Sequence, residues 1–216
     1  MIKGELIIII LTQVFGLIIL SLVGYLSKHY WGNFTWTTQG VFSFHSFFMV
    51  LSMIYGLGTA MIVYITPIPL ESTIKKVIHA AIHMLNLIFL IVGLAATVKF
   101  HQDFGIEHFK TIHSWIGISV IIVYSIQSLL SIALNFLPCA PESLKEKTMF
   151  LHKYLGLFIF LCSLVTVLTG ITVMNSSATT QKAISMGNFL GVFIILFVGM
   201  VVFLLVKKIM IGSSQN

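Results

Sequence analysis

Charge is scarce in this sequence. Only 8% of its 216 residues are charged, whereas 58% are hydrophobic, and none is arginine. Such an apolar composition excludes an ordinary soluble domain and indicates a membrane protein. None of the lysines lies in the middle of an apolar stretch, so the net charge of +6 fits membrane topology and lipid headgroups. We therefore expect no nucleic-acid partner.

Cysteines are few as well, and linkers are absent. Of the two cysteines, Cys139 is expected in a loop and Cys162 deep in a span, which excludes a disulfide framework. No linker or low-complexity tract divides the chain. We predict a single transmembrane domain over residues 1–216, with any chemistry placed among the helices or at their mouths.

Long hydrophobic runs dominate what is present. Six stretches between charges are long enough to cross a bilayer, which needs about 20 apolar residues. The first is longer than the apolar core of a secretory signal, and no small-x-small cleavage site follows it, so we interpret it as a retained helix. The sequence predicts an all-α membrane protein with six transmembrane helices, at residues 6–26, 40–64, 77–98, 113–136, 152–174 and 187–206.

The lysines predict the orientation of these helices. An even number of spans places both termini on one side, and lysine is enriched in cytosolic loops. Eight lysines fall on the terminal side (Lys3, Lys75, Lys76, Lys145, Lys147, Lys153, Lys207, Lys208) and four on the other (Lys28, Lys99, Lys110, Lys182). Two N-x-S/T sequons, at Asn33 and Asn175, fall on the lysine-poor side, where glycosylation is possible. We predict cytosolic N- and C-termini.

Four histidines fall inside the predicted spans at two matched depths. His45 and His113 are expected near the non-cytosolic face, and His79 and His152 near the cytosolic face. A lone histidine in a span is commonly a hydrogen-bonded core residue, but one from each of four helices favours a functional path. Two imidazoles on facing helices are what a six-coordinate haem iron needs. We predict that helices 2–5 form a four-helix bundle around two b-type haems, with irons roughly 15 to 20 Å apart.

His83 leaves alternatives open. It follows His79 by one helical turn and shares its face, so it is either an alternative ligand or a supporting group. The His79/His83 pair is also compatible with a divalent-metal transporter. The spans contain no Asp or Glu, and no two helices are broken at matching positions, which argues against transport. The four histidines likewise argue against a third interpretation, a membrane protein that has lost its cofactors.

Short motifs around these histidines mark a family resemblance over residues 28–175. They are His113-Ser114-Trp115-Ile116-Gly117 (H-S-W-x-G), Lys76-Val77-Ile78-His79 (K-x-x-H), Leu137-Pro138-Cys139-Ala140-Pro141-Glu142-Ser143 (L-P-x-A-P-x-S) and His152-Lys153-Tyr154-Leu155-Gly156 (H-x-x-x-G). On these motifs the sequence resembles the cytochrome b561 family, ascorbate-dependent transmembrane electron carriers that include ferric reductases.

The resemblance implies an oxidoreductase with two haem b groups. His45 and His113 would hold the non-cytosolic haem, and His79 and His152 the cytosolic one, in a core of about residues 40–175. Electrons would pass from cytosolic ascorbate to ferric or cupric ion, or to monodehydroascorbate, on the other side. Family members are commonly homodimers. Which membrane holds the protein, and which acceptor it uses, are left open.

The resemblance also implies substrate contacts. Lys76 and Lys145 would bind the ascorbate anion, Lys145 in the place of a usual arginine. His101 and His29 would contact the acceptor or its metal, whereas His108 matches no family residue and is expected at the surface. The sequence departs from the family pattern at Ser43, Ser46, Ile65, Lys110 and Phe150. These changes spare all four haem ligands but remove a cytosolic arginine at Ile65.

Overall fold

The fold is a bundle of long helices. The computed structural model describes residues 2–37, 39–67, 69–136 and 141–213, and within these ranges every regular element is helical. The elements are α1 (Ile2–Tyr30), α2 (Val41–Val50), the π-helical η1 (Leu51–Gly56), α3 (Leu57–Ile62), α4 (Ser72–Phe104), α5 (Ile112–Phe136), α6 (Glu142–Ser176) and α7 (Gln181–Ser213). The all-α prediction is confirmed.

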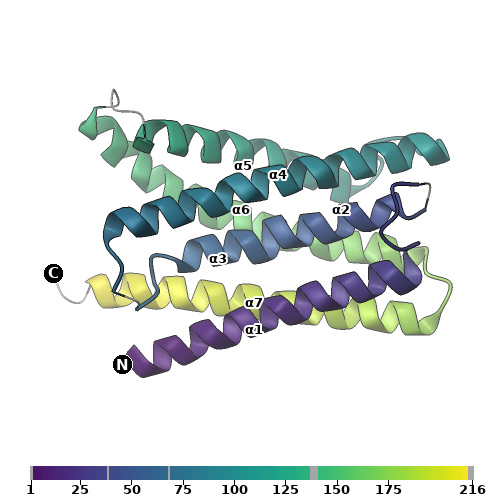
Figure 1. Ribbon diagram of the computed structural model, residues 1–216, viewed down its shortest axis with the longest axis horizontal. Helices are drawn as coiled ribbons and strands as arrows, with labels where there is room; N and C mark the ends of the chain where they lie inside the picture. Colours follow the sequence, from purple (N-terminus) through teal and green to yellow (C-terminus); the bar gives the residue numbers. More distant parts are fainter. Residues whose placement is uncertain (1, 38, 68, 137–140, 214–216) are drawn as a thin grey trace.

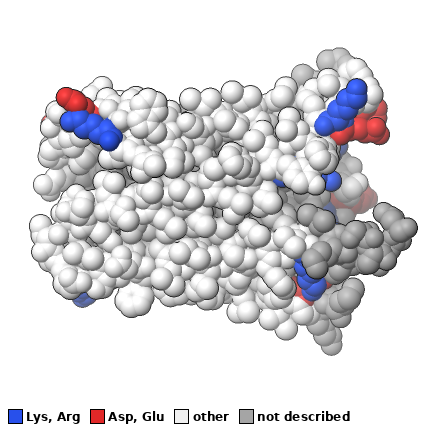
Figure 2. All heavy atoms as spheres, turned by 180° about the vertical axis from the view of Figure 1, so that it is seen from behind, with Lys and Arg blue, Asp and Glu red and all other residues white. Residues whose placement is uncertain are grey.

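Six of the described helical segments are long and apolar enough to span a membrane, as predicted. The second consists of α2, η1 and α3 in direct succession, so residues 41–62 cross as one rod with a π-helical middle. Figure 2 shows lysine and acidic side chains at the two ends of the molecule and an uncharged band between them. That band is the surface expected to meet lipid tails.

The start of α1 and the end of α7 lie at the same end of the bundle (Figure 1). We call this end the terminal face and the other end the opposite face. The helices continue beyond the apolar runs at both faces: α6 begins at Glu142, ten residues before the expected start at His152. The backbone hydrogen bonds of a helix persist where polar side chains meet water, so hydropathy marks only the membrane-crossing part. The loops are accordingly shorter than the sequence suggested, with four residues between α6 and α7.

Two helix pairs form the part of the bundle that matters for function. The α2–η1–α3 rod packs along α4, and α5 packs along α6, whereas α4 and α5 touch much less. Helices α1 and α7 pack on each other beside this four-helix core. Gly58 permits one close approach, because a Cβ there would lie 2.8 Å from the Phe197 ring of α7.

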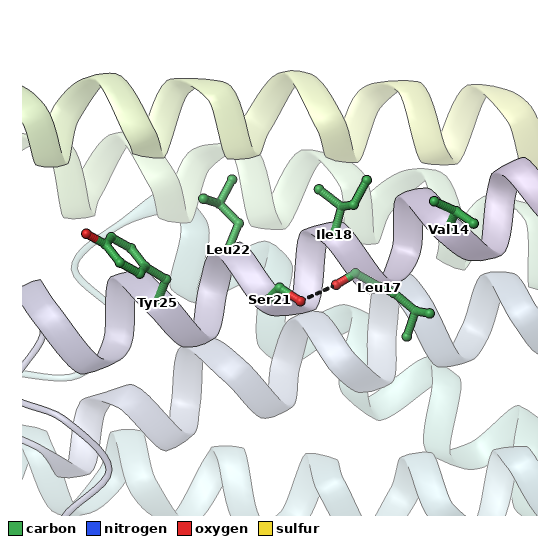
Figure 3. A pocket seen from close by; sticks show the side chains of 6 residues that line it. All are labelled: Val14, Leu17, Ile18, Ser21, Leu22 and Tyr25. Carbon is green, nitrogen blue, oxygen red and sulfur yellow. Dashed lines mark hydrogen bonds between the residues drawn. The ribbon is translucent and has the colours of Figure 1, made fainter.

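The outward surface of α1 carries a shallow groove, drawn in Figure 3. Its polar hydroxyl at Ser21 donates to the carbonyl of Leu17 in the same helix, at 2.8 Å. The groove therefore offers lipid a mostly apolar surface on which the Ser21 hydroxyl is already satisfied. Its lining residues are Val14, Leu17, Ile18, Ser21, Leu22 and Tyr25.

Candidate haem sites

The four intramembrane histidines meet in two pairs. His79 of α4 and His152 of α6 form the terminal-face pair, with ring centres 6.0 Å apart and planes at 71°. His45 of α2 and His113 of α5 form the opposite-face pair, with ring centres 6.2 Å apart and planes at 88°. Each pair thus draws one imidazole from the α2–η1–α3/α4 half and one from the α5/α6 half.

Backbone carbonyls hold three of these rings. In each ring Nδ1 donates to a backbone carbonyl oxygen: His45 to Gly93 at 3.1 Å, His79 to Ala60 at 2.9 Å, and His113 to Thr166 at 2.8 Å. A carbonyl can only accept, so in each ring Nδ1 carries the proton and Nε2 keeps its lone pair. This is the tautomer that a metal-binding imidazole needs, with its other nitrogen tethered.

The fourth ring is held by a side chain. Nδ1 of His152 lies 2.9 Å from the hydroxyl oxygen of Ser131 on α5. Ser131 also accepts, through its backbone carbonyl, a hydrogen bond from Asn135. Ser131 was not among the site residues predicted from the sequence.

The two pairs lie at levels set by a repeated spacing. Gly93 follows His79 by fourteen residues on α4, and Thr166 follows His152 by fourteen on α6. Fourteen residues rise about 21 Å and make nearly four whole turns, so each helix presents both levels on one face. Each of these two helices supplies a ring to one level and a tethering carbonyl to the other.

His83 is one turn deeper in the bundle than His79. Its side chain is buried, and its Nδ1 lies 2.8 Å from the phenol oxygen of Tyr124 on α5. The rings of His79 and His83 touch almost at right angles, with centres 4.4 Å apart. Of the two roles left open for His83, the geometry favours a supporting one.

A polar stripe on α5 supports the terminal-face pair. It consists of Tyr124, Gln127, Ser128 and Ser131, spaced i, i+3, i+4 and i+7 so that all four share one face. Nε2 of Gln127 donates to the carbonyl of His152 at 3.4 Å, and Ser131 holds the ring of the same residue. Polar residues at helical spacing in an apolar span are uncommon, so the stripe itself was visible in the sequence, although the partners of its side chains were not.

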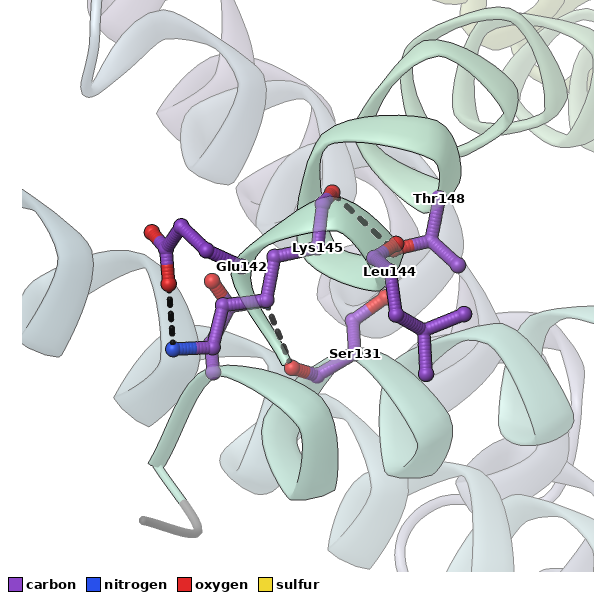
Figure 4. Close-up of polar contacts among 6 residues, drawn as sticks. Ser131, Glu142, Leu144, Lys145 and Thr148 are labelled. Carbon is purple, nitrogen blue, oxygen red and sulfur yellow. Dashed lines mark hydrogen bonds and ion pairs between the residues drawn. The ribbon is translucent and has the colours of Figure 1, made fainter. Parts of the chain in front are cut away.

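The lysines predicted to bind ascorbate lie at the terminal face. Lys76 is exposed near the start of α4, and the neighbouring Lys75 donates to the carbonyl of Thr66 at 3.2 Å. Lys145 lies 2.9 Å from the carboxylate of Glu142, so its charge is already paired (Figure 4). The first four residues of the L-P-x-A-P-x-S motif, 137–140, which include Cys139, lie outside the described residues.

Tyr64, just after α3, covers the mouth side of His79. The two ring centres are 5.2 Å apart, and the tyrosine is 46% exposed. Partial burial raises the pKa of its phenol, so the group stays protonated at neutral pH and available as a donor. Tyr64 is likewise a residue of this site that the sequence motifs did not predict.

At the opposite face, His101 and His108 stack with ring centres 4.8 Å apart and planes at 18°. His29, at the end of α1, packs on Tyr25 with ring centres 4.4 Å apart. Nδ1 of His101 is buried and has no hydrogen-bond partner among the described residues. The prediction that His108 lies at the surface holds, but its stacking on His101 was not foreseen.

Comparison with known proteins decides the family. The profile described as "Eukaryotic cytochrome b561" matches residues 44–178, which is more than half of the chain and includes all four paired histidines. This chain belongs to the cytochrome b561 family.

Several curated cytochrome b561 relatives are similar over most of the chain. The plasma membrane ascorbate-dependent reductase CYBRD1 of Xenopus laevis is 35% identical over 173 residues, 76% of this chain and 61% of the relative. The transmembrane ascorbate ferrireductase 2 of Arabidopsis thaliana is 28% identical over 205 residues, which cover 90% of this chain and 89% of the relative. The mouse lysosomal membrane ascorbate-dependent ferrireductase CYB561A3 is 35% identical over 149 residues, which cover 66% of this chain and 60% of the relative. The chain thus spans about three fifths of the frog and mouse relatives.

A cytochrome b561 implies b-type haem, and both histidine pairs fit that group. One iron bound by two imidazole nitrogens at about 2 Å each separates the two ring centres by about 6 Å. The observed separations are 6.0 and 6.2 Å. The tethered Nδ1 atoms leave Nε2 as the donor nitrogen in at least three of the four rings.

The transporter alternative gains no support. No group of three or more His, Cys, Asp or Glu side chains that could hold a bare metal ion occurs in the described part of the chain. Family membership points instead to redox chemistry.

Proposed function

We propose that this protein transfers electrons across a membrane through two b-type haems. The terminal-face haem would be bound by His79 and His152, and the opposite-face haem by His45 and His113. The observation that carries this proposal is the presence of two imidazole pairs, each spaced for one iron, at two levels of one bundle. We further propose that the haem-binding core spans about residues 40–175 of a single domain.

We propose ascorbate as the donor, at a cytosolic terminal face. The relatives named above are ascorbate-dependent reductases or ferrireductases, and the eight terminal-side lysines favour a cytosolic placement. Lys76 offers the ascorbate anion an exposed positive charge, and the protonated phenol of Tyr64 offers a hydrogen bond beside His79. Ascorbate would lose one electron and one proton, the proton remaining in the cytosol.

We propose that the acceptor binds at the opposite face, near His101 and His29. Ferric or cupric ion is reduced by one electron without a proton, and imidazole nitrogens suit such metals. Monodehydroascorbate is the other candidate, and it would take up one electron and one proton there. The stacked His101 and His108 rings give this face two neighbouring imidazoles.

The chain's own contribution is to hold the rings and exclude water. A bound b-type haem supplies a one-electron carrier at each level. The tethers from Gly93, Ala60, Thr166 and Ser131 fix the four imidazoles, which limits reorganisation when charge changes. The uncharged band between the faces lets an electron cross while ions stay on their own sides (Figure 2).

Proteoliposomes test the proposal. Purified protein should show reduced-minus-oxidised spectra of low-spin haem b, with pyridine extraction giving close to two haems per chain. With ascorbate sealed inside, external ferric chelate should be reduced, and a parallel assay with monodehydroascorbate ranks the acceptors. Vesicles without protein are the control. A folded but colourless preparation would overturn the proposal.

Orientation and assembly need separate measurements. A protease-sensitive tag on either terminus should be protected in intact cells and cleaved once the plasma membrane alone is permeabilised, which exposes the cytosol but not the lumen of organelles. We propose a homodimer on the family resemblance, and its mass in detergent or nanodiscs checks this directly.

A further inference from the structure

A buried polar cluster lies between the two histidine pairs, on the terminal-face side. Its members are only slightly exposed: His83 7%, Asn86 2%, Tyr124 1% and Ser128 5%. Polar side chains this deep in a span are costly unless they hydrogen-bond, and they usually have a functional role. The proposed electron-transfer function assigns roles to the four paired histidines and none to this cluster.

Within the cluster, Tyr124 holds His83 in place. The 2.8 Å hydrogen bond between them runs from α5 to α4, two helices that otherwise touch little. Tyr124 is the most buried tyrosine of the bundle core, so its phenol has one fixed position. His83 therefore has little freedom to rotate.

His83 in turn limits the rotation of His79. The two rings meet edge to face, 4.4 Å between centres, and Tyr64 meets His79 from another side at 5.2 Å. The Nδ1 tether to Ala60 fixes one point of the His79 ring but leaves it free to tilt about that hydrogen bond. Contacts with these two neighbouring rings restrict that tilt.

We infer that His83, held by Tyr124, is a positioning residue that sets the plane of the His79 imidazole at the terminal-face haem. This inference rests on the proposed haem ligation and goes beyond it by giving His83 a role distinct from a ligand. His83 lies about 6 Å deeper than His79 along α4, so it is off the level at which His79 faces His152. The hydrogen bond between its Nδ1 and Tyr124 fixes the ring, while the depth of His83 is what separates its role from that of a ligand.

At the opposite-face pair no described contact corresponds to the tyrosine-bound histidine that packs on His79. There the His45 ring contacts Phe42, with ring centres 5.4 Å apart, and no second histidine packs on either ligand among the described contacts. A change in the His83–Tyr124 unit should therefore affect one haem and spare the other. This asymmetry supplies an internal control.

Electron paramagnetic resonance of the oxidised protein tests the inference. The largest g value of a low-spin ferric haem rises as its two axial imidazole planes approach perpendicular. The 88° and 71° pairs should thus give two distinct signals, the terminal-face one at the lower g value. Tyr124→Phe removes one hydroxyl, and we expect it to shift the terminal-face signal and that haem's midpoint potential only. Haem content should stay at two per chain.

Matched variants separate positioning from general damage. Tyr55→Phe removes a hydroxyl from a partly buried tyrosine in η1 and should leave both signals in place. In a His83→Leu background, Tyr124→Phe should produce little further shift, because it acts through His83. If His83→Leu fails to accumulate, the single Tyr124→Phe variant and the next measurement still decide.

His79→Ala distinguishes a positioning residue from a spare ligand. We expect this variant to lose the terminal-face signal and about half of its haem although His83 remains. Two low-spin haems in His79→Ala, or an unshifted terminal-face signal in Tyr124→Phe, would overturn the inference while leaving transmembrane electron transfer intact. Absence of haem from the unmodified protein would instead overturn the proposed function.

Discussion

The two histidine pairs have nearly the same ring spacing but are supported by different means. At the opposite face both tethers are backbone carbonyls, Gly93 and Thr166. At the terminal face one tether is the Ser131 hydroxyl, and a polar stripe on α5 surrounds it. Substituting the side chain of the tethering residue leaves a backbone tether in place, whereas the same kind of change removes a hydroxyl tether. The opposite-face pair should therefore respond to changes in helix packing, and the terminal-face pair to changes in polar side chains.

Removing one ligand from each pair gives the largest expected effect. His113→Ala should abolish the opposite-face haem, and His152→Ala the terminal-face haem, each lowering haem content from two per chain to about one. Pyridine extraction and visible difference spectra measure this loss. Transmembrane electron transfer should stop in both variants. Two intact haems after either change would refute the pairing.

A packing change should disturb the opposite-face pair alone. A Cβ at Gly170 would lie 2.8 Å from Cε1 of His113, so Gly170→Ala must push the ring off its Thr166 tether. Overpacking of this kind costs about 1–3 kcal/mol of stability. We expect a shifted or partly lost opposite-face signal and a lower melting temperature. Gly117→Ala is the control, because its Cβ would make an ordinary 3.4 Å contact with Thr166.

A polar change should disturb the terminal-face pair alone. Ser131→Ala leaves Nδ1 of His152 without its partner, and loss of such a tether typically weakens metal binding about 10- to 100-fold. Faster loss of the terminal-face haem to apomyoglobin during dialysis would report this. Ser119→Ala on the same helix loses only a bond to its own backbone and should have no effect. Equal loss from both sites would show that the two supports are not independent.

The smallest expected effects concern the donor. Lys76→Gln should raise the KM for ascorbate about 2- to 5-fold, the size of an exposed charge interaction, and the effect should shrink in high salt. Glu142→Gln should lower the KM by a similar factor, because it frees the charge of Lys145. The KM for the external acceptor should not change in either variant. A KM effect of Lys76→Gln that persists in molar salt would argue against a charge contact.

The pairing of the histidines could be predicted from the sequence because depth in a membrane is encoded simply. Hydropathy fixes where a span begins, and the count of residues from that point gives the level of His45 or His152. The Lys145–Glu142 ion pair could also be predicted from the sequence, because acidic and basic residues three apart on a helix are neighbours.

Other features could not be predicted because they depend on neighbouring helices. A serine in a span most often bonds its own backbone, as Ser21 and Ser119 do, so Ser131 gave no sign of reaching across to His152. The π-helical turn at η1 left no trace in hydropathy either. It ends at Gly56, where a side chain would overlap the amide of Asn86 on α4, a packing relation visible only in three dimensions.

The pairing of α1 with α7 has a consequence for how the chain assembles. These helices pack along each other, and Glu5 of α1 lies 3.2 Å from Lys207 of α7. Helix α1 is synthesised before α7, so its partner emerges only after the helices that carry the four paired histidines have been made. Until then the flank of α1 that packs on α7 lacks its partner, so the outer layer of the bundle closes only after the histidine-bearing helices have been inserted.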